Sequence, residues 1–167
     1  MRHVVVAVVF AAALAGCGGS DSEDEGDEFV RQVDSLCAEA RPELAEIRAS
    51  VIRARDAARA GRVSAQETFD TFATLLRRAG AITDRFEEQL RSIEVPSGEE
   101  EFHQALTESV EKGSTNVREQ VSAAEAEDAV RLRELSIEGT TIEAERTGLI
   151  EGRGGFEECG QDAGGGE

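Results

Sequence analysis

The chain contains no tryptophan, no tyrosine, one lysine and two histidines, and each scarcity excludes a class of function. Tryptophan and tyrosine are the usual stacking platforms for bases and sugars, so nucleic acids and glycans are poor candidate ligands. Acidic residues outnumber basic ones by 35 to 18, which gives a net charge of −17. That charge repels nucleic acid and anionic lipid headgroups. We therefore expect no nucleic-acid partner.

Catalytic motifs are also missing. The sequence has no Gly-x-Ser-x-Gly pattern, which marks a nucleophilic serine, and residues 152–155 neither follow a strand nor open a helix, as a phosphate loop does. Past the N-terminal leader the single histidine is His103. It shares a predicted helix face with Glu100, as in carboxylate-bridged di-iron bundles, but those sites need a second such pair and two further glutamates. We interpret Glu100 as a capping residue and His103 as an ordinary exposed or half-buried side chain, and expect no enzymatic activity, no cofactor and no metal site.

Long apolar runs are confined to the N-terminus. The basic start, Met1-Arg2-His3, precedes ten apolar residues at 4–13, which match the core of a signal peptide and are too few for a membrane span of roughly 20 residues. Residues 14–16 suit a signal peptidase, and Cys17 offers a thiol for a diacylglyceryl group. We predict a lipoprotein signal peptide over residues 1–16 and lipidation of Cys17. The alternatives are an ordinary secretory signal with Cys17 unmodified, and a buried apolar segment of a cytosolic protein.

Lipid alone would then hold the mature chain at a membrane. Each buried methylene contributes about 0.8 kcal/mol, so two or three acyl chains such as palmitate anchor a protein stably. The excess of arginine over a single lysine indicates a GC-rich bacterial genome, and hence a cell with one membrane. We expect the protein on the extracytoplasmic face of the bacterial cell membrane.

The chain has three cysteines, and in an exported protein an uneven number leaves one cysteine without a disulfide partner. With Cys17 lipidated, Cys37 and Cys159 remain as a pair, and an oxidising compartment favours a disulfide between them. Two independent thiols are the alternative. A zinc site is less favoured, because the chain offers too few further ligands to close it.

The two ends of the mature chain have the composition of flexible segments. Residues 18–28 are glycine, serine and mutually repelling acids, so we predict that Cys17 and these residues, 17–28, form a flexible tether. Cation binding by the acidic run is the alternative, but an unstructured run offers no fixed coordination geometry. Glycine-rich residues 161–167 are predicted to form a disordered tail.

Between these ends, residues 29–160 are predicted to form one helical domain. Apolar residues recur three or four positions apart in four segments, the pattern of amphipathic helices. The four stripes are Phe29, Val33, Leu36, Ala40, Leu44, Ile47, Val51 and Ala54; Phe69, Phe72, Leu75, Leu76, Ala79, Ile82, Phe86, Leu90 and Ile93; Phe102, Leu106, Val110, Val117 and Val121; and Val130, Leu132, Leu135, Ile142 and Leu149. Pro42 predicts a kink or short break near residues 38–41, because it lacks an amide proton.

Local signals mark the helix ends. Ser64 with Glu67, and Ser97 with Glu100, are candidate capping boxes for the second and third helices. Gly113 is expected to weaken the third helix. In the fourth, Gly139 interrupts the apolar stripe.

Short connections favour antiparallel neighbours, so the predicted fold is all-α, an up-down-up-down four-helix bundle. This topology brings the start of the first helix and the end of the fourth to one end, where Cys37 and Cys159 can meet. A disulfide closing so long a loop contributes about 4 to 5 kcal/mol in the chain-entropy model. A helical hairpin that dimerises through the same stripes is the alternative.

The residues Phe29-Val30, Val33, Leu36 and Cys37 after an acidic spacer, with the closing segment 155–160, resemble a group of small actinobacterial lipoproteins of uncharacterised function. The resemblance implies a helical domain tied by a disulfide. It carries no catalytic or ligand-binding residues to this chain.

Two classes of function remain. The first is a membrane-tethered interaction module that contacts another envelope protein, which an exposed apolar patch of several hundred Å² would support. The second is a helical domain that binds a small molecule or a divalent cation between its helices, which an apolar cavity would favour for the small molecule. The sequence favours the first.

Overall fold

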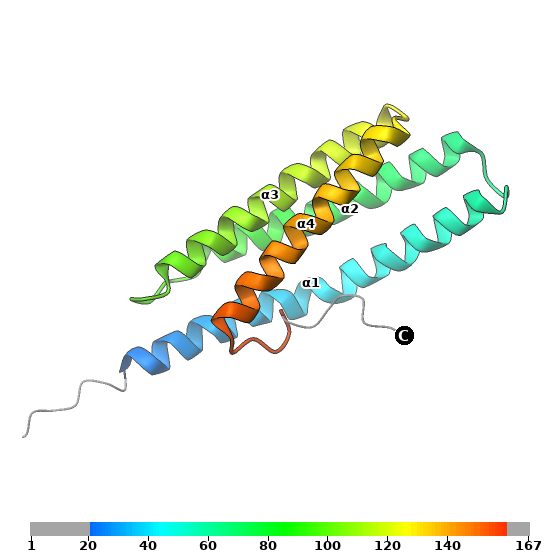
Figure 1. Ribbon diagram of the computed structural model, residues 1–167. Coiled ribbons are helices and arrows are strands. Elements are labelled where there is room, and N and C mark those ends of the chain that lie inside the picture. Colours follow the sequence, from blue (N-terminus) through cyan, green and yellow to red (C-terminus); the bar gives the residue numbers. More distant parts are fainter. Residues whose placement is uncertain (1–20, 160–167) are drawn as a thin grey trace, which may run out of the picture.

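The structure, a computed structural model, describes residues 21–159 (Figure 1). This part of the chain forms four helices and no strand: α1 (Asp21–Arg59), α2 (Ala65–Ser92), α3 (Glu100–Glu125) and α4 (Ala129–Arg153). Each helix runs back along the one before it, so the predicted all-α up-down-up-down bundle is confirmed. Among these helices, none combines the length and the apolar character that crossing a bilayer requires.

The bundle is open along one side. Helix α2 packs between α1 and α3, and α4 packs on α3. Within the described residues the backbones of α1 and α4 do not approach each other closely. Figure 1 shows α4 running obliquely across the α2–α3 pair, with its last turns coming down to the beginning of α1. The first and last helices share the core at one end of the bundle and the Arg48–Glu143 contact, and the segment that follows α4 links them further.

The main hydrophobic core lies at the end of the bundle where α1 begins. Its buried members are Phe29, Val30, Val33, Leu90, Leu106, Val110 and Ile150. The ring of Phe102 lies edge-on to that of Phe29, with centroids 6.3 Å apart, and stacks on Phe156 at 5.6 Å. A second, smaller cluster of Ile47, Leu75 and Ile82 lies farther along α1 and α2. The aromatic rings thus close one end of the bundle.

Helix α1 is longer and more continuous than the sequence predicted. It begins at Asp21, so residues 21–28 are helical, and the predicted flexible tether is wrong for them. Acidic side chains near a helix N-terminus are stabilised by the helix dipole, by about 0.3 to 1 kcal/mol each, and the buried ring of Phe29 anchors the turn that follows. The helix also continues through Pro42, so of the predicted kink or short break near residues 38–41 the break is wrong. The signal peptide, Cys17 and the tail at residues 161–167 lie outside the described residues.

One predicted capping box is confirmed and the other is wrong. The hydroxyl of Ser64 accepts a hydrogen bond from the Glu67 N–H at 3.2 Å, and the Glu67 carboxylate accepts one from the Ser64 N–H at 2.8 Å. Helix α3, in contrast, begins at Glu100 with Glu99 as its N-cap, and the Glu100 carboxylate accepts a hydrogen bond from the Gly98 N–H at 2.7 Å. Gly98 has a positive φ of 96°, and the helix begins two residues later than a cap at Ser97 would place it.

Helix α4 is continuous through Gly139. A Cβ atom at this position would lie 3.0 Å from Oδ1 of Asn116, so the glycine lets α3 and α4 approach closely. The predicted apolar stripe of α4 is only partly right: Leu135 is buried, but Val130 is 70% exposed. Ile150, which lies outside that stripe, is buried.

Candidate functional site

A cleft of about 510 Å³ lies on the open side of the bundle. All four helices line it, and Glu158 and Cys159 border it at the end of the described chain. Its volume falls within the range of about 300 to 1,000 Å³ that is typical of small-molecule sites. The apolar lining from α1 and α2 consists of Ala40, Leu44, Ile47, Leu76, Ala79, Ile82 and Phe86.

The cleft exists because its walls differ in polarity. Helix α4 contributes mostly polar residues to it: Ser136, Thr140, Glu143, Arg146 and Thr147. Burying such a face against the apolar side of α1 would remove water from polar groups without replacing their hydrogen bonds. Leu44, Leu76, Phe86 and Ile142 consequently remain only half-buried around the cleft.

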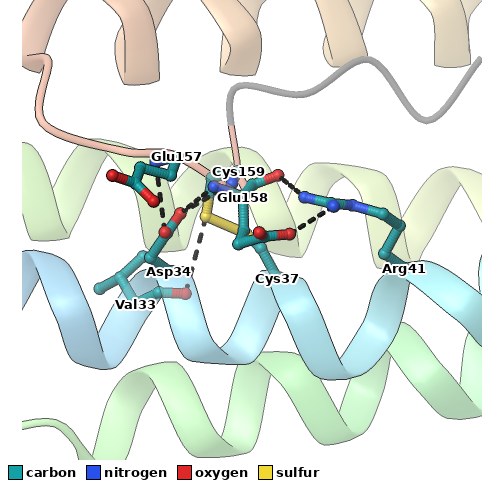
Figure 2. The surroundings of a disulfide bond; sticks show 7 residues. All are labelled: Val33, Asp34, Cys37, Arg41, Glu157, Glu158 and Cys159. Atoms are coloured by element: carbon teal, nitrogen blue, oxygen red, sulfur yellow. Dashed lines mark hydrogen bonds and ion pairs between the residues drawn. A yellow bond between two sulfur atoms is a disulfide. The ribbon is translucent and has the colours of Figure 1, made fainter. Parts of the chain in front are cut away.

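The predicted disulfide between Cys37 and Cys159 is confirmed and borders one end of the cleft. The two Cα atoms lie 5.1 Å apart, although the cysteines are 122 positions apart in the sequence (Figure 2). The bond joins α1 to the segment that follows α4, residues 154–159, which we call the C-terminal segment. This covalent link ties the last part of the described chain to α1, whose backbone has no close contact with that of α4.

Polar contacts fix the C-terminal segment on α1 (Figure 2). The carboxylate of Asp34 accepts hydrogen bonds from three successive backbone N–H groups, those of Glu157 at 3.2 Å, Glu158 at 2.7 Å and Cys159 at 2.8 Å. One turn beyond Cys37, Arg41 pairs with the Glu158 carboxylate and also donates to its carbonyl oxygen. The disulfide end of the cleft is therefore held by covalent, ionic and hydrogen bonds.

The base of α4 is held by a second ion pair. Arg153 donates to both carboxylate oxygens of Glu99, from Nε at 2.9 Å to each and from Nη2 at 2.5 Å to one. The hydrogen bond with Glu99 raises the pKa of Arg153. Because Glu99 directly precedes α3, this pair joins the end of α4 to the beginning of α3.

Five charged side chains line the cleft, and one of them is unmatched. Arg41 pairs with Glu158, and Arg48 lies 3.9 Å from the carboxylate of Glu143. Arg146 forms no hydrogen bond or ion pair with any residue in the range 21–159. Burial lowers its pKa, an effect that the nearby charge of Glu143 opposes, and the guanidinium remains charged at neutral pH.

The Arg146 side chain reaches from α4 to α3. A Cβ atom on Gly113 would lie 3.7 Å from its Nη1 atom. The polar groups of α3 farther along the cleft are already engaged: Asn116 Nδ2 donates to the Leu135 carbonyl at 3.0 Å, and Gln120 Nε2 donates to Asn116 Oδ1 at 2.6 Å. A positive charge that forms no hydrogen bond or ion pair among the described residues therefore faces a cleft with an apolar wall.

No residue of this cleft is predicted from the sequence as a ligand contact. Arg146 could not be distinguished from the other 16 arginines by its neighbours in the sequence. The available signal was the polar series Ser136, Thr140, Glu143 and Thr147, which recurs at helical spacing in α4. The sequence does not show whether such a face meets solvent or the interior of the bundle.

Glu100 and His103, the one candidate pair for metal chemistry, do not form a shared site. His103 is half-buried, with Nε2 3.0 Å from the Leu90 carbonyl oxygen and its ring edge-on to Phe29 at 6.1 Å. Glu100 instead binds the Gly98 N–H. Over the described range, no three His, Cys, Asp or Glu residues are grouped so that they could hold a metal ion.

Comparisons of the chain with models of known protein families, with curated proteins and with solved structures found no match. The resemblance to small actinobacterial lipoproteins stays a prediction. The cleft and the residues around it are thus the basis on which a function is proposed.

Proposed function

We propose that the helical domain binds a small apolar or amphipathic molecule in the cleft between α1 and α4, as part of a lipoprotein anchored through Cys17 on the extracytoplasmic face of the membrane. The cleft itself is the observation that carries this proposal: about 510 Å³ of space lined by half-buried apolar side chains. Apolar surface gains about 25 cal/mol per Å² when it leaves water. An apolar ligand in the cleft would supply that gain.

The fixed end of the cleft supports binding. The disulfide, the Asp34 contacts and the Arg153–Glu99 pair hold α1, α3 and the C-terminal segment together before any ligand arrives. A preformed site loses less conformational freedom on binding, so more of the contact energy appears as affinity. The structure therefore favours the second class of function over the first.

The interaction-module hypothesis gains less support from the described surface. Its exposed large hydrophobic residues are Ile52, Val63, Val130 and Ile137. They are distributed over α1, the α1–α2 connection and α4, and singly exposed hydrophobic residues are ordinary on protein surfaces. Binding to an envelope protein remains a prediction, and we assign no part of the described surface to such a partner.

Binding of Nile red, an uncharged apolar dye that fluoresces in apolar surroundings, tests the proposal. The protein would consist of residues 18–167, exported into an oxidising compartment, because this part contains every described helix, both hydrophobic clusters and the disulfide. We expect saturable binding of one dye per chain.

A matched pair of tryptophan variants locates the dye. Thr140 lines the cleft, and its hydroxyl bonds only carbonyl groups of its own helix, so Thr140→Trp should fill the cleft at little cost in stability. Glu138→Trp places the same side chain at an exposed position of α4 outside the cleft. Loss of dye binding in the first variant and retention in the second support the proposal. Equal binding in both variants, or none in the parent protein, contradicts it.

A further inference from the structure

We propose that the cleft selects a single-chain carboxylate amphiphile, a fatty acid or a molecule of the same chemistry, with its carboxylate on the guanidinium of Arg146 and its chain along the apolar wall of α1 and α2. The inference rests on the proposed function and names the class of ligand. It is carried by the position and the unmatched charge of Arg146.

The charges of the cleft favour an anionic headgroup. Its lining holds three arginines and two glutamates, and the two glutamates lie beside Arg41 and Arg48. The cleft therefore has one excess positive charge, in a chain whose net charge is −17. A partly buried cation without a partner is costly, and a bound anion would remove that cost.

The chemistry of arginine favours a carboxylate. Its planar guanidinium presents parallel N–H groups that match two carboxylate oxygens. Glu143, one turn before Arg146 on α4, raises the Arg146 pKa by its charge but forms no hydrogen bond with it and lies beside Arg48. Gly113 leaves the opposite side of the guanidinium free of a side chain. A ligand carboxylate can thus take a position beside Arg146 that no group of residues 21–159 occupies with a hydrogen bond or ion pair.

The size of the cleft favours one chain. If a methylene takes about the 30 Å³ that a water molecule occupies in the liquid, 510 Å³ holds roughly 17 such groups. One acyl chain of that length fills the cleft. The second chain of a phospholipid would have to remain outside, in contact with water.

Displacement of Nile red from residues 18–167 tests the selectivity. This protein lacks Cys17 and so carries no acyl chain of its own. Hexadecanoate and hexadecanol have the same chain and differ in the charge of the headgroup. We expect hexadecanoate to displace the dye at a concentration at least about tenfold lower than hexadecanol does. This difference is the effect of one charge-assisted hydrogen-bonded pair.

Substitutions on α4 distinguish the effect of a charge inside the cleft from the effect of the protein's net charge. Arg146→Gln should remove the preference for hexadecanoate, and Arg146→Lys should keep part of it. Arg133→Gln, at an exposed position of α4 outside the cleft, removes the same charge and should leave the preference unchanged. Nile red, which is uncharged, should bind all four proteins and so show that each is folded.

Three results would overturn the inference and leave the proposed function intact. They are equal displacement by hexadecanoate and hexadecanol, a preference that persists in Arg146→Gln, and stronger displacement by phosphatidylglycerol vesicles than by hexadecanoate. Failure of Nile red to bind the parent protein would overturn the proposed function itself.

Discussion

The carboxylate of Asp34 accepts a hydrogen bond from the backbone N–H of Cys159 at 2.8 Å. It joins two residues at opposite ends of the domain, beside the disulfide that Cys159 forms with Cys37. The contact explains how a bundle whose first and last helices have no close backbone contact can still be closed at one end. One end is fixed, while the side between α1 and α4 remains available to a ligand.

Removing the disulfide should destabilise the domain strongly. We expect Cys37→Ser with Cys159→Ser to lower the free energy of unfolding by about 4 to 5 kcal/mol, because the bond restricts a long loop in the unfolded chain. Urea unfolding followed by circular dichroism measures the change. Adding a thiol reductant should lower the free energy of unfolding of the parent protein by the same amount and leave that of the double variant unchanged. An unchanged urea midpoint would contradict the role we assign to the bond.

The carboxylate of Asp34 should hold the C-terminal segment against α1. Asp34→Ala leaves three N–H groups without their acceptor and should cost about 1 to 3 kcal/mol. Hydrogen exchange at the amides of Glu158 and Cys159 should accelerate, because the carboxylate no longer protects them. Glu39→Ala, at an exposed position of the same helix, is the control. Exchange rates that match the parent protein in both variants would exclude this contact.

Replacing Arg146 should stabilise the empty domain. Arg146→Met keeps a long side chain and removes an unpaired, half-buried charge, so we expect a gain of about 0.5 to 1 kcal/mol. For a domain of this size that corresponds to a rise of about 1 to 4 °C in the midpoint of thermal unfolding. Arg133→Met, outside the cleft, should change the midpoint less. A lower midpoint for Arg146→Met would mean that the guanidinium has a stabilising partner in the protein.

The capping box at the start of α2 should lower the pKa that an acid titration of Glu67 measures. Hydrogen bonds from the backbone N–H and then the hydroxyl of Ser64 hold the pKa of this carboxyl below its ordinary value of 4.5. A carboxyl with a lowered folded-state pKa contributes stability above its unfolded-state pKa, and the contribution is lost as the pH falls through the folded-state value. The box should therefore stabilise α2 at neutral pH and open in acid.

Two substitutions separate the two hydrogen bonds. Ser64→Pro removes the N–H and the hydroxyl together, and the φ of −72° at this position suits proline. It should raise the pKa of Glu67 further than Ser64→Ala, which removes only the hydroxyl. Titration of the carboxyl by nuclear magnetic resonance measures both values. An identical pKa in the two variants would show that the backbone N–H is not the main cause.

The parts of the fold that depend on local pattern could be predicted from the sequence. The stripe that begins at Phe29 and the reciprocal cap of Ser64 are encoded within a few residues, and the disulfide followed from the number of cysteines and the bundle topology. The start of α1 at Asp21 could not be predicted from composition. An acidic run is typical of a flexible tether, but the helix dipole and the buried ring of Phe29 favour a helix here.

The remaining features depend on contacts between distant residues. Ser97 does not cap α3, and its neighbour Glu99 binds Arg153, 54 positions away. Thr140 and Arg146 line the cleft from a polar face of α4, and the sequence alone does not show whether that face meets solvent or the interior of the bundle. The cleft arises because that face lies opposite the apolar side of α1, and this relation is set only by the packing of α4 on α3.

The most direct test of the account follows the arginine side chains by nuclear magnetic resonance while hexadecanoate is added to residues 18–167. We expect one arginine Nε–H signal to shift and to become protected from exchange at one ligand per chain. Arg146→Gln should remove this signal, and Arg133→Gln should retain it. If no arginine signal responds, or if the same signal responds in Arg146→Gln, the cleft does not hold a carboxylate on Arg146.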